Sequence, residues 1–209
     1  MKFKFKFACL LSQLILASLA LSHSSNLLAY GTGLSSYPLP EHSGALTTEF
    51  STFFSDEKGL GLQARYLRKI NQRVAIEGSI GASDSQLSKR FGVAGDIEVS
   101  PDVDHYPRFV VRPFIERSTE YGKNYNTIGA YPILSKGYVF FENTGYPFVS
   151  LPMSVAFSSG TNQFRMAAAF GITGKLPISG YDNVLLNLEG SINITQSFNG
   201  IFLGLSYPL

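Results

Sequence analysis

The sequence has no tryptophan, one cysteine, three histidines and few charged residues. The cysteine, Cys9, lies near the start of the chain, so the rest has no thiol for a disulfide, a nucleophile or a metal cluster. Charged residues make up 15% of the chain, whereas an average soluble domain has about 25%. This shortage of charge indicates that much of the protein surface does not face water.

Residues that carry chemistry are also scarce. The histidines are His23, His42 and His105. Only Asp102, Asp104 and His105 lie close together, and such a group could bind a metal or act in acid–base catalysis. Two prolines flank them, which favours a polar turn. Because no Ser–His–Asp, phosphate-loop or Cys–His motif is found, we expect no enzyme activity, no catalytic residue, no metal and no cofactor.

The N-terminal segment has the three parts of a secretory signal peptide. Lys2, Lys4 and Lys6 precede an apolar run over residues 7–21, and small residues follow. Removal of residues 1–22 takes away three lysines and no acid, so the formal charge changes from +2 to −1. No nucleic-acid partner is therefore expected. Residues 23–42, rich in Ser, Gly, Pro and Leu, are predicted to form an extended or mobile leader before a domain at 43–209.

From residue 43 onward, apolar residues alternate with polar or small ones, which is the period of a β-strand. For example, Leu60, Leu62 and Tyr66 lie on the face opposite Gln63 and Arg65. The segments run for about ten residues, the length needed to cross a bilayer at a tilt. We predict an all-β fold, an antiparallel up-and-down transmembrane β-barrel of about ten strands, with eight or twelve also possible.

Prolines make one region harder to assign. Pro132, Pro147 and Pro152 each remove a ladder donor. Strands are expected near 125–134 and 146–158, with 138–142 either extending the second strand or lining a loop.

The polar faces carry charges of both signs at similar depths. These residues are Arg65, Glu77, Arg112, Arg165 and Glu189. They indicate a polar lumen with paired charges, and a three-residue turn at 70–72 would place Arg65 opposite Glu77. Aromatic residues near strand ends are expected to form girdles at the membrane interfaces. They are Phe54, Tyr106, Tyr125, Tyr138, Tyr181, Phe198 and Tyr207.

The final strand also carries a short motif. Gly204, Tyr207 and Leu209 resemble the C-terminal signal of bacterial outer-membrane β-barrel proteins, in which a glycine is followed by hydrophobic residues three and five positions later. The resemblance implies an outer-membrane location, contact with outer-membrane lipid and recognition by the barrel-assembly machinery. Oligomeric state is not readable from the sequence.

Short connections between the strands leave little surface for receptor binding. The sequence therefore favours a small outer-membrane barrel with a structural or narrow-pore role. Two alternatives stay open at this point: an outer-membrane lipid-processing enzyme and a soluble, secreted, lipocalin-like carrier of apolar ligands.

Overall fold

The protein was analysed as a computed structural model. The structure describes residues 31–209 except 55–57, 85–86, 121, 141–142, 160 and 177–182. The predicted signal peptide with Cys9, the first part of the expected leader with His23, and Tyr181 lie outside the described residues.

Nearly all regular structure in the described chain is β-strand. The strands are β1 (Gly44–Phe53), β2 (Gly59–Lys69), β3 (Val74–Ser83), β4 (Leu87–Ser100), β5 (Arg108–Glu120), β6 (Lys123–Ser135), β7 (Tyr138–Phe140), β8 (Asn143–Ser150), β9 (Met153–Ser158), β10 (Thr161–Lys175), β11 (Leu185–Thr195) and β12 (Gly200–Pro208). A short 3₁₀ turn, η1 (Gly33–Ser36), precedes them. None of the helical structure in the described chain is long and apolar enough to cross a membrane.

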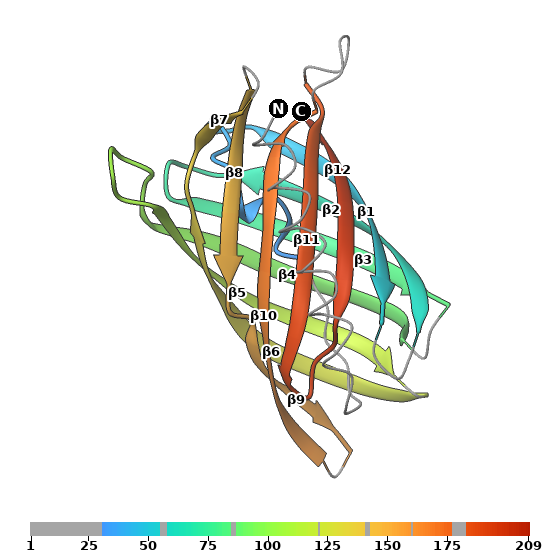
Figure 1. The fold of residues 1–209 in the computed structure, drawn as a ribbon. Helices are drawn as coiled ribbons and strands as arrows, with labels where there is room; N and C mark the ends of the chain where they lie inside the picture. The colour runs from blue at the N-terminus through green and yellow to red at the C-terminus, as the bar shows by residue number, and fades with distance from the viewer. Residues whose placement is uncertain are drawn as a thin grey trace, which may run out of the picture.

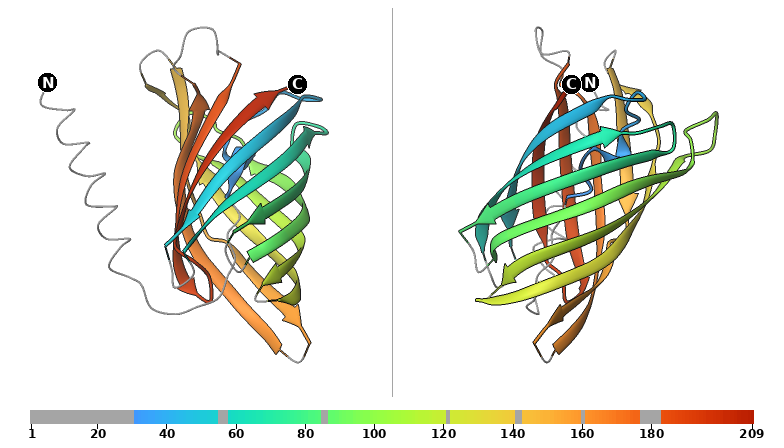
Figure 2. Two further views of the ribbon diagram at one scale, coloured as in Figure 1. Left: turned by 90° about the vertical axis from the view of Figure 1, so that its right-hand side faces the viewer. Right: turned by 180° about the vertical axis from the view of Figure 1, so that it is seen from behind.

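The strands form a closed antiparallel barrel of ten positions (Figures 1 and 2). From β1 to β6 and from β9 to β12 each strand pairs with the next in sequence, and β12 closes the ring against β1 with Pro208 opposite Ala45. β8 and β9 occupy one position, because both pair with β6 on one side and with β10 on the other. The predicted fold class and strand number are confirmed.

Prolines explain the interruption between β8 and β9. Leu151 donates to the carbonyl of Pro132 and Ala167 to that of Pro152, but neither proline returns an N–H. The register on both neighbours is unchanged across the break, so β8 and β9 are one interrupted strand and not two separate ones. β7 continues the register of β6 against β8, so residues 138–140 extend the first of the two predicted strands, and the expectation that they extend the second strand or line a loop was wrong.

The two faces of the barrel are the reverse of those in a soluble protein. Outward side chains are apolar and exposed, for example Phe50 (58%) and Ile80 (66%). Inward side chains are polar and buried, including Arg65 (2%) and Glu189 (1%). Water would not stabilise such an exterior, whereas hydrocarbon would. The distribution is typical of a transmembrane barrel and does not fit a lipocalin-like carrier, whose interior is apolar.

Two of the expected girdle aromatics point inward instead. Phe198 packs with Phe53 and Phe202 in a buried cluster between β1 and β12. Tyr125 is also buried, and the Arg165 guanidinium lies 5.1 Å from its ring centroid. Both have the parity of the inward face, Phe198 with Gly200 and Phe202 and Tyr125 with Thr127, so their position near a strand end did not decide the face that they occupy. These aromatics pack inside the barrel near the end opposite the C-terminus.

The longest connections lie at the end of the barrel that holds the C-terminus. They join β4 to β5 (residues 101–107) and β10 to β11 (residues 176–184). At the other end β5 and β6 are separated only by residues 121–122, and β9 and β10 only by 159–160. Figure 1 shows the β9–β10 hairpin as the part that projects furthest at that opposite end.

A charge placed on the outer wall should oppose membrane insertion. Leu188 is 42% exposed and lies mid-strand in β11. Leu188→Arg is expected to lower the free energy of unfolding by about 2 to 4 kcal/mol in lipid. Urea unfolding in lipid vesicles measures it, with Leu188→Ala as the matched control. Equal losses for the two variants would mean that this face does not meet hydrocarbon.

Candidate functional site: the occupied lumen

The five charged residues predicted to line the lumen all face it. Exposed fractions are 2% for Arg65, 5% for Glu77, 2% for Arg112, 1% for Arg165 and 1% for Glu189. Within the described residues, the buried charged side chains are five acids and five bases. They are Glu49, Glu77, Asp96, Glu116 and Glu189, and Arg65, Lys69, Arg108, Arg112 and Arg165. Equal numbers of each sign allow the charges to compensate one another without solvent.

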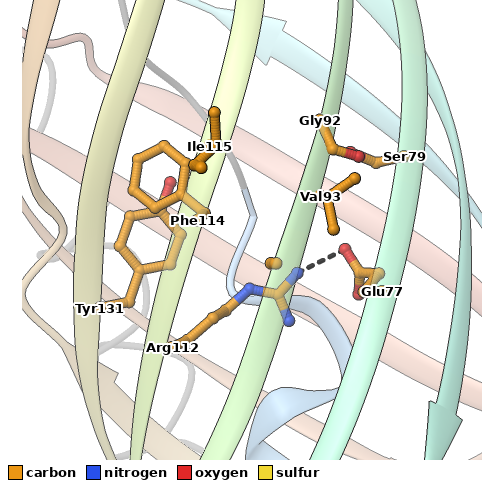
Figure 3. Close-up of a pocket in the computed structure, with 9 residues that line it drawn as sticks. Glu77, Ser79, Gly92, Val93, Arg112, Phe114, Ile115 and Tyr131 are labelled. Atoms are coloured by element: carbon orange, nitrogen blue, oxygen red, sulfur yellow. Dashed lines mark hydrogen bonds and ion pairs between the residues drawn. The ribbon is translucent and has the colours of Figure 1, made fainter.

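The predicted partners of Arg65 and Glu77 were wrong. Arg65 on β2 pairs with Glu49 on β1, with its Nη2 2.6 Å from Oε2 and 2.7 Å from Oε1. Glu77 on β3 pairs with Arg112 on β5, which also binds Asp96 on β4 at 3.0 Å. Figure 3 shows Arg112 reaching along the wall toward Glu77.

The turn between β2 and β3 accounts for the error. Residues 70–73 form a four-residue turn, in which Ile70 and Asn71 donate to the carbonyl of Val74. The Asn71 side chain accepts from the amides of Arg73 and Val74. Lys69 pairs with Ala75, so five residues lie between the paired strand ends instead of the predicted three, and Arg65 lies opposite Ser79. Both residues of the expected pair still face inward, because a shift of two keeps each side chain on its face.

Other lumen charges are held in different ways. Arg108 and Lys69 share the carboxylate of Glu98, at 2.7 and 3.7 Å. Arg165 donates to Gln163 at 2.9 Å in addition to its contact with Tyr125. Glu189 makes no ion pair with any cation in the described chain, and its hydrogen bonds come from Thr32. The five predicted residues are thus held by different direct partners around the wall.

Thr32 belongs to a segment that the sequence prediction placed outside the barrel. Residues 31–36 and Leu39 are buried, and η1 lies inside the ring of strands, visible in blue through the wall in Figure 1. This part of the leader is thus neither extended nor free. We call residues 31–40 the lumen segment.

The lumen segment is held mainly through its main chain. Arg65 Nη1 donates to the Gly31 carbonyl at 2.7 Å, and Arg108 Nη1 donates to the Ser35 carbonyl. Ser135 Oγ donates to the Ser36 carbonyl at 3.0 Å, and the Thr32 amide donates to Glu189 Oε2. The partners come from β2, β5, β6 and β11, so one short segment is fixed from several sides of the barrel.

Its hydroxyl groups add side-chain contacts. Ser35 Oγ donates to Asp96 at 3.0 Å and accepts from Arg112. Ser36 Oγ donates to Thr173 at 2.8 Å, and Thr32 Oγ1 lies 2.9 Å from Ser150 Oγ. These bonds extend the attachment to β4, β8 and β10. The two bonds of Ser35 involve charged partners, and such bonds are each worth roughly 1.5 to 3 kcal/mol.

Two glycines allow the close approach to the Arg65–Glu49 pair. Gly33 has φ +61°, and a Cβ built there would lie 2.3 Å from Arg65 Nη1. A Cβ at Gly31 would lie 2.5 Å from Glu49 Oε2. A larger residue at position 33 would be strained by its backbone and would also collide with the guanidinium.

Apolar packing fixes the segment near the rim. Leu34 and Leu39 join a buried cluster formed by the first inward residues of several strands. The strand residues are Ala45, Leu67, Ala75 and Leu185. Tyr37 packs edge-on against Tyr146 with ring centroids 5.2 Å apart. The chain then reaches β1, where Gly44 and Leu209 exchange hydrogen bonds at the barrel seam.

A small pocket opens in the lumen beside the Arg112–Glu77 pair (Figure 3). Phe114 and Tyr131 form one wall, with ring centroids 4.8 Å apart, and the small residues Ser79 and Gly92 form the other. Among the lining residues, the Ser79 hydroxyl donates to the Gly92 carbonyl and Glu77 is held by Arg112.

The predicted turn at residues 101–107 is a structural clip. Lys136 Nζ binds Asp102 and donates to the Asp104 carbonyl at 2.6 Å, while the Gly137 amide donates to Asp102 at 2.8 Å. His105 is exposed. Within the described ranges no three His, Cys, Asp or Glu side chains are grouped to hold a metal.

The residues of the C-terminal motif occupy both faces of β12. Gly204 faces the lumen, where a Cβ would meet Asn187 at 3.4 Å. Tyr207 and Leu209 point outward and are 54% and 65% exposed. The motif therefore combines a close contact inside with two apolar groups outside.

The lumen segment is what sequence reasoning missed. Its signals are present in the sequence: Gly31 and Gly33 two positions apart, followed by Ser35 and Ser36. Small residues of this kind fit a narrow interior, but they are equally common in loops.

Comparisons with known proteins give little more. No protein-family model matches the chain, and the search of curated proteins returned no match. One similar solved structure is titled "De novo design of transmembrane beta-barrels", with a TM-score of 0.42 and 10% sequence identity. The match covers 82% of this chain and 99% of the designed one.

The Arg65–Glu49 pair should behave as a coupled unit. Arg65→Ala leaves Glu49 charged and buried, so we expect a loss of roughly 3 to 5 kcal/mol in the free energy of unfolding. The double variant Arg65→Ala/Glu49→Ala should lose less than the sum of the single variants, in urea unfolding in detergent. Arg68→Ala, an exposed cation on the same strand, is the control and should change little. Additive losses would rule out the coupling.

The Asp102 clip should depend on pH. Burial alone would raise the pKa of Asp102, but hydrogen bonds from Lys136 and Gly137 and the charge of Lys136 outweigh it and hold the pKa below its ordinary value. The clip is therefore fully present above about pH 4 and is lost as the pH falls through the lowered pKa. Hydrogen exchange at the Gly137 amide should lose protection over that acidic range. Asp102→Asn should show weak protection at every pH, and an unchanged wild-type protection factor down to acid would contradict the assignment.

Proposed function

We propose that this chain is a small outer-membrane β-barrel protein with a structural role, whose lumen is closed by its own N-terminal segment. The observation that carries the proposal is the lumen segment, residues 31–40, buried inside a ring of compensated charges. An open porin keeps water along its axis. Here a peptide occupies that space and uses the hydrogen bonds that water would otherwise make.

Location in the outer membrane is supported by three features. The outer wall is apolar over strands of bilayer-crossing length. The first 22 residues have the pattern of a signal peptide, and Gly204, Tyr207 and Leu209 resemble the outer-membrane assembly signal. In this proposal lipid surrounds the barrel and the assembly machinery recognises β12. With an even number of strands both ends of the barrel domain lie on one side, which is the periplasm in such proteins.

The proposal separates a structural role from a porin role by the state of the lumen. A ten-strand barrel is only slightly wider than one that side chains alone can fill. The inward Arg and Glu side chains and the lumen segment together fill the space that this extra width creates.

Electrical recording tests the proposal. Purified wild-type protein in a planar bilayer should give little or no steady conductance. Gly33→Val should raise it at least several-fold, because the valine cannot adopt the left-handed backbone or fit beside Arg65. Gly78→Val is the matched control, since a Cβ at Gly78 meets no atom within 4 Å.

Each variant is first checked by its faster migration before boiling, which reports a folded barrel. Large ion-selective steps from the wild type would show that the protein is a porin. A silent, folded Gly33→Val protein would mean that the segment does not close the lumen.

A further inference from the structure

The lumen segment occupies a site with the properties of a peptide-binding site. Four of its main-chain groups, from Gly31, Thr32, Ser35 and Ser36, are bound by side chains of the barrel wall. Contacts to the main chain depend on the path of a peptide and not on its attachment to the barrel. The same contacts are therefore open to a separate peptide that follows this path.

The ion pairs that position the wall's cations do not involve the segment. Arg65 is fixed by Glu49, Arg112 by Glu77 and Asp96, and Arg108 by Glu98. Each of these pairs joins one strand to another and needs no atom of residues 31–40. A binding site preorganised in this way loses little freedom when a ligand enters.

Glu189 is the exception, and it points to a ligand. Its side chain is 1% exposed, and no ion pair joins it to a cation in the described ranges. Its hydrogen-bond donors are the amide and hydroxyl of Thr32. The charged groups facing it are Glu49 and Arg65, and Arg65 is engaged by Glu49. A buried carboxylate needs hydrogen-bond donors, and here the peptide segment supplies them through Thr32.

The walls also define which peptides fit. The wall leaves no room for a Cβ at the positions of Gly31 and Gly33. At the positions of Ser35 and Ser36, Asp96 and Thr173 accept hydrogen bonds from the serine hydroxyls. We infer that the part of the lumen that residues 31–40 occupy is a binding site for short peptides of the pattern Gly-x-Gly-x-Ser-Ser, and that residues 31–40 fill it in the resting protein. This inference rests on the proposed function, because it requires that the segment closes the lumen.

The tether explains why the site is filled by the chain's own segment. Residues 41–43 alone separate the lumen segment from β1. A tether this short gives an effective concentration on the order of millimolar or above, which a free peptide at lower concentration does not overcome. A free peptide should therefore enter only when the native segment is weakened.

The experiment uses the full chain carrying Gly33→Val, recorded in a planar bilayer, with a synthetic peptide of residues 31–40, GTGLSSYPLP. We expect this peptide to reduce the raised conductance in a saturable way, toward the wild-type level. The same peptide with Gly33→Val should have at least tenfold weaker effect, and the wild-type chain should respond to neither.

The outcomes separate the two claims. A conducting Gly33→Val protein that the wild-type peptide fails to close overturns the binding site but leaves the closed-lumen proposal intact. Equal block by both peptides also overturns it, because the block would then be non-specific. A folded Gly33→Val protein that never conducts overturns the proposed function instead. If this variant does not fold, Gly33→Ala, with a smaller side chain at the same position, is recorded with the same two peptides.

A second measurement does not depend on conductance. Thr32 Oγ1 and Ser150 Oγ lie 2.9 Å apart, so cysteines at these positions would be close enough to form a disulfide. The Gly33→Val chain with Ser150→Cys should form a mixed disulfide with a peptide in which Thr32 is replaced by cysteine. No mixed disulfide, with a folded barrel, would overturn the binding site.

Discussion

Compensation of charge inside a closed wall is the constraint on which the rest of the structure depends. A carboxylate or guanidinium removed from water costs several kcal/mol unless a partner is fixed nearby. The barrel meets this cost with pairs that join neighbouring strands, such as Arg65 with Glu49 and Arg112 with Asp96. Because both members of each pair must face inward, the pairs also keep each strand on its face. A strand rotated to present its other face would expose charge to the outer wall.

The lumen segment follows from the same constraint. Ten strands enclose more space than their inward side chains fill, and several inward residues of this barrel are Ser, Gly or Ala. Guanidinium and carboxylate groups that line such a space need further hydrogen-bond partners. Residues 31–36 provide carbonyls to Arg65 and Arg108 and an amide to Glu189. A peptide without large side chains in this part is suited to the narrow axis, and Gly33 permits the turn that it makes there.

The interrupted strand shows a different balance. Pro132, Pro147 and Pro152 each lack the N–H that would donate to a neighbouring strand, yet the register on each side is preserved. Packing inside the lumen offsets the missing bonds: Phe148 of β8 joins Val110, Phe114, Tyr131 and Ile133 in a buried apolar cluster. This part of the wall is thus held more by side chains and less by backbone hydrogen bonds than the rest.

The sequence by itself determined most of the strands, the faces of their regular parts and a strand number of about ten, because period two is a local property and each apolar face is continuous along its strand. The inward position of Arg65, Glu77, Arg112, Arg165 and Glu189 follows from the same pattern. Which of these charges meet was decided only by the tertiary structure. Pairing depends on the length of a turn, and a connection two residues longer than predicted moved Glu77 away from Arg65. The place of residues 31–40 was also decided there, since Gly and Ser fit a loop as well as a lumen, and only the closed ring of strands creates the buried donors and acceptors that hold them.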